Sequence, residues 1–62
     1  MLRSAGYDPV LRILELEFVN GTVYRYFEVP DDLFCGLMAA ASHGEFLATR
    51  IRDAGFDYIQ AD

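Results

Sequence analysis

Apolar and polar residues alternate most clearly between Ile13 and Val19. Two leucines and a phenylalanine are separated there by two glutamates, in the order Leu14, Glu15, Leu16, Glu17, Phe18. A period of two residues is typical of a β-strand that buries one face. The pattern therefore predicts a strand with one apolar and one charged face.

The turn after this strand decides which side chains meet across the hairpin. Asn20-Gly21 is a strong turn signal and by itself favours a two-residue turn, which would place Arg25 opposite Leu16. A three-residue loop ending at Gly21 instead places Tyr24 opposite Leu16 and Arg25 opposite Glu15. This second register matches apolar with apolar and cation with anion, so we expect it.

Three further segments have strand character. Leu2–Tyr7 is a weaker first strand that ends at the turn signal Asp8-Pro9. Thr22–Val29 is rich in aromatic and β-branched residues and is predicted to be the return strand of the hairpin. Phe56–Ile59 is compatible with a short C-terminal edge strand.

Helical spacing begins after Pro30, which ends the third strand and precedes two aspartates that favour a helix N-terminus. Apolar residues then recur every three or four positions: Leu33, Leu37, Ala40, Ala41. We expect His43 in the last turn of this helix, Gly44 as its C-terminal cap, and a second helix over Glu45–Ile51. The element order predicts an α+β fold, in which an antiparallel three-stranded meander is followed by two short helices on one sheet face.

The length and net charge of the chain limit the classes of protein to which it can belong. We interpret the 62 residues, of which 53% are hydrophobic, as one domain over residues 1–62. A core this small gives a net stability of only ~3–5 kcal/mol, which favours oligomerisation. The net charge is −5, with five arginines and no lysine, so the overall field opposes a polyanionic partner.

The candidates for catalysis and metal binding are few. Cys35 and His43 would lie ~12 Å apart along one helix, too far for a nucleophile and its base. Cys35 is predicted to be buried and unreactive among apolar helix residues. Four acids considered as metal ligands lack the spacing for it: Glu15, Glu17, Glu28, Asp57. We expect no catalytic residue, no cofactor and no metal, and hence no enzyme.

The most informative segment for binding is the central Tyr24-Arg25-Tyr26. It predicts either a strand that presents aromatic rings and a guanidinium to a ligand, or tyrosines packed under the helices with Arg25 bridging a glutamate. Arg50 and Arg52, on either side of Ile51, are candidates to join this site. Arg52 could equally pair with a neighbouring aspartate.

The preferred register also places apolar side chains on the charged face of the sheet, namely Ile13, Val23 and Phe27. Two short helices cannot cover both faces of a sheet. These three residues are therefore the candidate surface for self-association, most simply as a two-fold dimer.

The ordered set of residues resembles the KTSC domain family, which is named after a C-terminal extension of some lysyl-tRNA synthetases and also occurs as stand-alone bacterial proteins. Tyr24-Arg25-Tyr26 is the most recognisable element. The other matching positions are Ser4, Tyr7-Asp8, Leu14, Leu16, Phe18, Gly21, Val29-Pro30, Ala41-Ser42, Gly44, Phe46, Ile51-Arg52 and Tyr58. The attachment to a synthetase implies an RNA-binding role for the family.

The sequence thus favours a small, non-catalytic interaction module whose partner is itself or another protein. The alternative is an RNA- or DNA-binding domain that uses Tyr24, Arg25, Tyr26, Arg50 and Arg52. With one cysteine, no apolar run of membrane-spanning length and no signal-peptide core, we expect a cytoplasmic protein that does not bind membranes.

Overall fold

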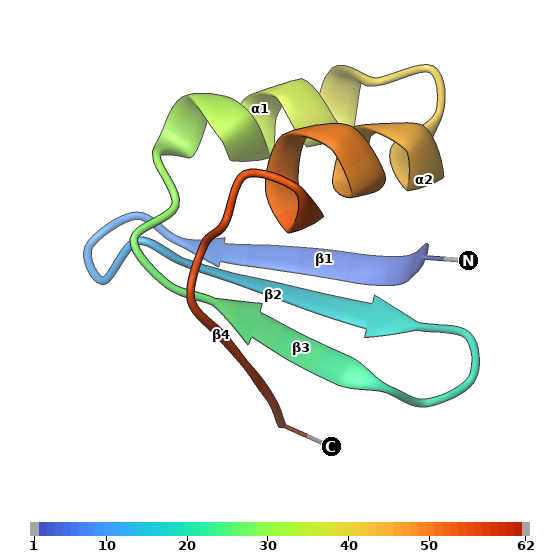
Figure 1. Cartoon of the computed structure of the whole chain (residues 1–62), viewed down its shortest axis with the longest axis horizontal. Coiled ribbons are helices and arrows are strands. Elements are labelled where there is room, and N and C mark those ends of the chain that lie inside the picture. Colours follow the sequence, from blue (N-terminus) through green and yellow to red (C-terminus); the bar gives the residue numbers. More distant parts are fainter. Residues whose placement is uncertain (1, 62) are drawn as a thin grey trace.

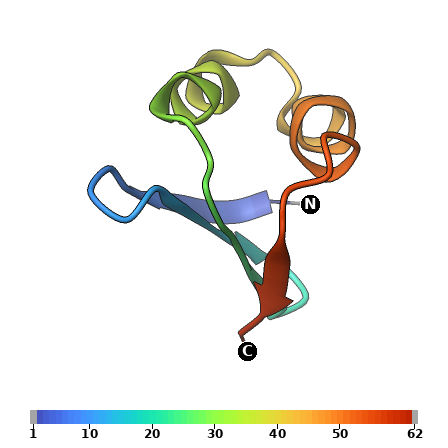
Figure 2. The ribbon, with the colours of Figure 1, turned by 60° about the vertical axis from the view of Figure 1, so that its left-hand side comes forward.

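The computed structural model describes residues 2–61 (Figure 1). Four strands form one antiparallel sheet in chain order: β1 (Leu2–Asp8), β2 (Ile13–Phe18), β3 (Val23–Tyr26) and β4 (Tyr58–Gln60). The helical segments are α1 (Asp31–Ala39), α2 (His43–Phe46) and the π-helical η1 (Leu47–Arg52). Figure 2 shows that they all lie over the same face of the sheet. The α+β class is confirmed, and β4 is the short C-terminal strand that the sequence allowed after the helices.

The predicted hairpin register is confirmed. Leu16 lies opposite Tyr24 and Glu15 lies opposite Arg25. The loop has three residues, because the amide of Phe18 donates to the carbonyl of Thr22 over 2.9 Å. Gly21 ends the loop with φ +90°, a left-handed conformation that costs glycine little.

The third strand is shorter than the predicted Thr22–Val29. Glu28 has φ +57°, which turns the chain out of the extended conformation after Tyr26. The amide of Phe27 then donates to the carbonyl of Asp57 over 2.9 Å. That bond belongs to the pairing with β4, which begins two residues later than the predicted Phe56–Ile59.

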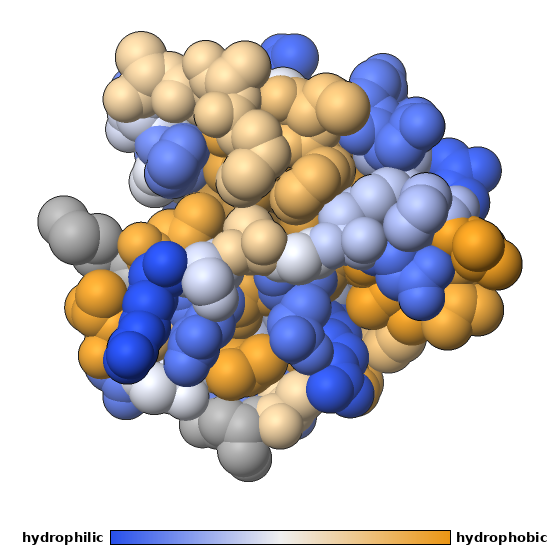
Figure 3. All heavy atoms as spheres, turned by 180° about the vertical axis from the view of Figure 1, so that it is seen from behind, coloured by the Kyte–Doolittle hydropathy of each residue, from blue (hydrophilic) through white to orange (hydrophobic). Residues whose placement is uncertain are grey.

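The turn between β1 and β2 is held by hydrogen bonds yet carries an apolar tip. The Asp8 carboxylate accepts from the amides of Val10 and Leu11, and Arg12 closes the turn with φ +58°. Val10 and Leu11 remain 86% and 64% exposed. Seen from behind, apolar side chains gather at this turn and over α1 (Figure 3).

The prediction for the end of the first helix is wrong. α1 ends at Ala39, and His43 begins α2 instead of lying in the last turn of α1. The Ser42 hydroxyl accepts from the amide of Glu45 over 3.3 Å, so this serine is the N-terminal cap of a new helix. Gly44 therefore lies inside a helix rather than at the end of one. The predicted Glu45–Ile51 helix becomes α2 followed directly by η1.

The core lies between the sheet and the helices. Its fully buried side chains come from both layers: Leu14, Leu16, Val29, Leu37 and Ile51. α1 approaches α2 closely at Gly36, where an added Cβ would lie 2.9 Å from the Phe46 ring. A side chain at this position would require the Phe46 ring to move.

Cys35 is exposed, which contradicts the prediction that it is buried. It is two positions from the buried Leu37, and two residues correspond to about 200° around a helix. The helix therefore directs Cys35 away from the core that Leu37 enters. Its apolar neighbours in the sequence did not reveal this orientation.

Candidate functional site

Three tyrosines lie together on the helix-facing side of β3 and β4. Tyr24 and Tyr26 project from β3, and Tyr58 on β4 is the direct partner of Tyr26. The ring centroids are 6.5 Å apart for Tyr24 and Tyr26, 5.8 Å for Tyr24 and Tyr58, and 5.3 Å for Tyr26 and Tyr58. We call these three residues the tyrosine cluster.

The strand geometry explains why these rings meet. Alternate residues of β3 share a face, and the antiparallel register adds Tyr58 to the same face. Exposure increases across the cluster, from the buried Tyr26 through the half-buried Tyr24 to Tyr58, which is 57% exposed. The cluster is anchored at one side and open to solvent at the other.

Arg52, the last residue of η1, contributes a cation next to the cluster. Together with Tyr26 it lines a cavity of about 170 Å³, which we call the Arg52 cavity. The rest of its lining is Leu2, Leu16, Phe18, Gly44, Leu47 and Ala48. π-Helical turns occur frequently at functional sites, and η1 supplies Leu47, Ala48 and Arg52 to this one.

Arg52 is weakly bound within the protein. Its Nε lies 3.7 Å from Oδ1 of Asp53, and both side chains are largely exposed. Such surface pairs contribute about 0–1 kcal/mol. The guanidinium can therefore turn to a ligand at small cost.

The surroundings of Tyr26 change the pKa of its hydroxyl. Burial raises the pKa of Tyr26, and the nearby Tyr58 and Tyr24 hydroxyls add to the increase. The positive charge of Arg52 acts in the opposite direction and lowers the pKa, which is consistent with its position beside the ring.

Arg25 does not join this site. It points to the helix-free face, where its Nε lies 2.7 Å from Oε2 of Glu15. The strand alternation that brings Tyr24 and Tyr26 together sends the residue between them to the opposite side. The predicted pairing of Arg25 with a glutamate is thus present.

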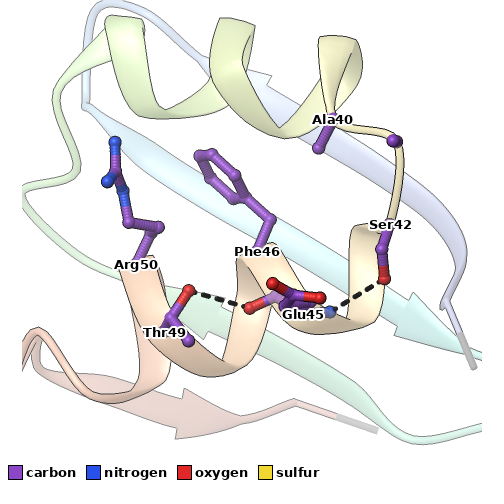
Figure 4. Close-up of a pocket in the computed structure, with 7 residues that line it drawn as sticks. Ala40, Ser42, Glu45, Phe46, Thr49 and Arg50 are labelled. Carbon is purple, nitrogen blue, oxygen red and sulfur yellow. Dashed lines mark hydrogen bonds between the residues drawn. The ribbon is translucent and has the colours of Figure 1, made fainter.

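Arg50 lies at a different groove, between the end of α1 and α2–η1 (Figure 4). Its guanidinium carbon is 5.7 Å from the centroid of the Phe46 ring. Glu45 and Thr49 line the same groove, where the Thr49 hydroxyl donates to the Glu45 carbonyl over 2.9 Å. Arg50 and Arg52 therefore serve separate surfaces.

The structure thus brings together Tyr24, Tyr26 and Arg52 from the five predicted binding residues. Tyr58 was missed as a site residue. The signal that could have found it was the continuation of the meander, because a fourth strand pairing with β3 must place alternate residues beside the two tyrosines.

The predicted self-association residues Ile13, Val23 and Phe27 are half-buried. Strand alternation places Ile13 and Val23 on the helix-free face, and Phe27 directly follows β3. The Glu15–Arg25 ion pair lies between them. Ile59, opposite Arg25 on β4, is 48% exposed and extends the apolar part of this face. We call these four residues the apolar sheet patch.

Residues 2–61 contain no group of three or more metal-binding side chains. Because α1 ends before His43, Cys35 and His43 lie on separate helices. The separation expected for two residues on one continuous helix therefore does not describe this pair. Within the same described range, no helix is long and apolar enough to cross a membrane.

These features define a small α+β domain in which helices cover one face of a four-stranded antiparallel sheet. The family model of the KTSC domain matches residues 1–56, so the chain belongs to the KTSC domain family. The resemblance based on the Tyr-Arg-Tyr strand is confirmed.

Relatives and a solved structure agree with this assignment. An uncharacterized protein from Stutzerimonas stutzeri is 39% identical over 61 residues, covering 98% of this chain and 86% of its own. A protein from Tsukamurella paurometabola is 48% identical over 46 residues, which are 74% of this chain and 69% of its own. The crystal structure of a KTSC domain protein from Yersinia pestis superposes with a TM-score of 0.88 at 32% identity, over 98% of this chain and 84% of the other.

Proposed function

We propose that this domain is a non-catalytic interaction module that binds a segment of another protein at the tyrosine cluster and Arg52. The observation that carries the proposal is the convergence of three aromatic rings near one edge of the sheet with a weakly paired guanidinium beside Tyr26. Tyrosine and arginine are enriched among the residues that dominate binding energy at protein interfaces. The module acts in the cytoplasm in this proposal.

Charge supports a protein partner over a nucleic acid. The chain carries −5, and non-specific binding to RNA or DNA depends on several cations that neutralise phosphates. Of the five arginines, Arg25 is held by Glu15 and Arg50 faces another groove. The tyrosine cluster has one adjacent guanidinium, which is enough for one anionic group but not for a polyanion.

A second candidate function is binding of single-stranded nucleic acid at the same place. The observation in its favour is Tyr58, which is 57% exposed. Its ring contacts the ring of Tyr26, and Tyr26 in turn lines the Arg52 cavity. Stacking of a base on an exposed aromatic ring is the usual interaction of sequence-tolerant single-strand binders.

Selection of peptides from a random display library against the immobilised domain, followed by NMR titration of the enriched peptides, tests the proposal. We expect saturable shifts at Tyr24, Tyr58 and Arg52. Tyr58→Ala and Arg52→Gln should each weaken binding about tenfold or more, because each removes a central contact. Arg50→Gln, the matched control in the same π-helix, should leave binding unchanged.

The nucleic-acid function is tested by NMR titration with mixed-sequence single-stranded RNA at about 0.15 M salt, where the screening length is about 8 Å. We expect diffuse or absent shifts. Saturable shifts at the tyrosine cluster that Arg52→Gln abolishes would replace protein binding with the nucleic-acid function. Peptides that bind only elsewhere would also contradict the proposal.

A further inference from the structure

The size of the Arg52 cavity restricts what can enter it. Its volume of about 170 Å³ is below the range of about 300–1,000 Å³ that is typical of sites for drug-sized ligands and cofactors. The cavity therefore suits one side chain rather than a whole small molecule.

The lining is apolar and well supported. Leu16, Leu47 and Tyr26 belong to the buried core, and Phe18 packs edge-on against Tyr24 with ring centroids 5.9 Å apart. The walls are thus held in place before a ligand arrives, which reduces the ordering cost of binding. An aliphatic side chain of a ligand would contact the apolar residues that line this cavity.

Arg52 is the charged group of this lining. A ligand that fills the cavity with an apolar side chain gains a charge-assisted contact with Arg52 when it also carries an anionic group very close to that side chain. In an extended peptide, neighbouring side chains point to opposite sides, so an acid at the next position would point away from Arg52. The terminal carboxylate of the last residue has no such restriction, because it is bonded to the Cα that carries the apolar side chain.

We propose that the Arg52 cavity binds the C-terminal residue of a partner chain, with its apolar side chain in the cavity and its carboxylate on the Arg52 guanidinium. This inference rests on the proposed function and specifies its ligand. A guanidinium binds a carboxylate through two parallel hydrogen bonds, the strongest form of this contact. A single terminal charge also suffers less repulsion from a chain of net charge −5 than an acidic segment does.

The test uses short peptides titrated into the ¹⁵N-labelled full chain. The probe is N-acetyl-Gly-Gly-Leu with a free C-terminus, compared with its C-terminal amide and with N-acetyl-Gly-Gly-Gly. A fourth peptide, N-acetyl-Gly-Asp-Leu-amide, moves the carboxylate to the preceding side chain. We expect the free acid with leucine to bind about tenfold more tightly than each of the other three, because only it presents both groups in the required arrangement.

Two variants and one control connect this preference to the cavity. Arg52→Gln should remove the difference between acid and amide, while Arg50→Gln should retain it. Ala48→Leu fills the cavity, so it should abolish binding of the free acid while the circular dichroism spectrum and melting temperature are maintained or improved.

Equal binding of acid and amide, or a preference for the acid that survives Arg52→Gln, would overturn the inference. If library peptides bind at the tyrosine cluster without needing a free C-terminus, this inference fails and the proposed function stands. If no peptide binds at the cluster, both fail.

Discussion

The two faces of the sheet are made from alternate residues of the same strands, but they are stabilised by different interactions. On the helix-facing side Leu14 and Leu16 are completely covered by α1, α2 and η1. On the helix-free side their chain neighbours Glu15 and Glu17 reach solvent and pair with Arg25 and Ser4. The first face carries the core and the tyrosine cluster, while the second carries the exposed Glu15–Arg25 ion pair and the apolar sheet patch.

This difference shows that a chain of 62 residues packs one face of its sheet and leaves the other largely to solvent. The helices cover the end of the sheet where leucines lie and leave Tyr58 open. The helices do not cover the other face, where the charged side chains of Glu15 and Arg25 form an exposed ion pair. Exposed ion pairs of this kind contribute little to stability. Exposed aromatic or apolar side chains therefore remain on both sides, at the places where packing is incomplete.

The largest effect should come from truncating a leucine of the core face. Leu16→Ala removes a side chain that is 1% exposed and should cost about 3 kcal/mol, most of the stability expected for so small a domain. Val23→Ala, at the half-buried position on the other face, should cost about 1 kcal/mol or less. Urea unfolding measures both, and equal losses would mean that the two faces contribute alike.

The next effect concerns association. We expect a dimer through the apolar sheet patch at high micromolar concentration. Ile59→Asp should weaken that dimer about tenfold or more, because it places a carboxylate in the interface. Leu11→Asp, at the exposed turn between β1 and β2, is the matched control and should leave it unchanged. Sedimentation equilibrium decides, and a stable monomer in the unaltered protein would refute this expectation.

A smaller effect is expected at the Glu15–Arg25 pair. Both side chains are about half exposed, so a double-mutant cycle with Glu15→Gln and Arg25→Gln should give a coupling energy below about 1 kcal/mol. The coupling should nearly vanish in 1 M salt, where the screening length falls to about 3 Å. A larger, salt-resistant coupling would show that this face is shielded from solvent, as in a dimer.

The smallest effect is a pH dependence from Tyr26. Its raised pKa means that the unfolded chain loses this proton first as pH rises above 10.0, the ordinary pKa of a tyrosine. Stability should therefore be constant with respect to this group below that pH and should fall above it. Tyr26→Phe should flatten the decline, measured as melting temperature against pH. An unchanged decline would contradict this prediction.

The sequence by itself determined much of the sheet. Alternation along β2 and the charge match between Glu15 and Arg25 fixed the hairpin register, because a slip by one residue would have exchanged the faces of every side chain. The same alternation separated Arg25 from the two tyrosines. These patterns are local, because each depends only on residues that are close together in the sequence.

What only the tertiary structure decided depends on contacts between distant segments. The end of α1, the exposure of Cys35 and the pairing of Tyr58 with Tyr26 all follow from how the helices and the last strand pack on the sheet. Arg50 and Arg52 look equivalent in the sequence, and the π-helix assigns them to different grooves. The site could not be predicted in full because its parts come from β2, β3, β4 and η1, and their distances are set by packing rather than by any local pattern.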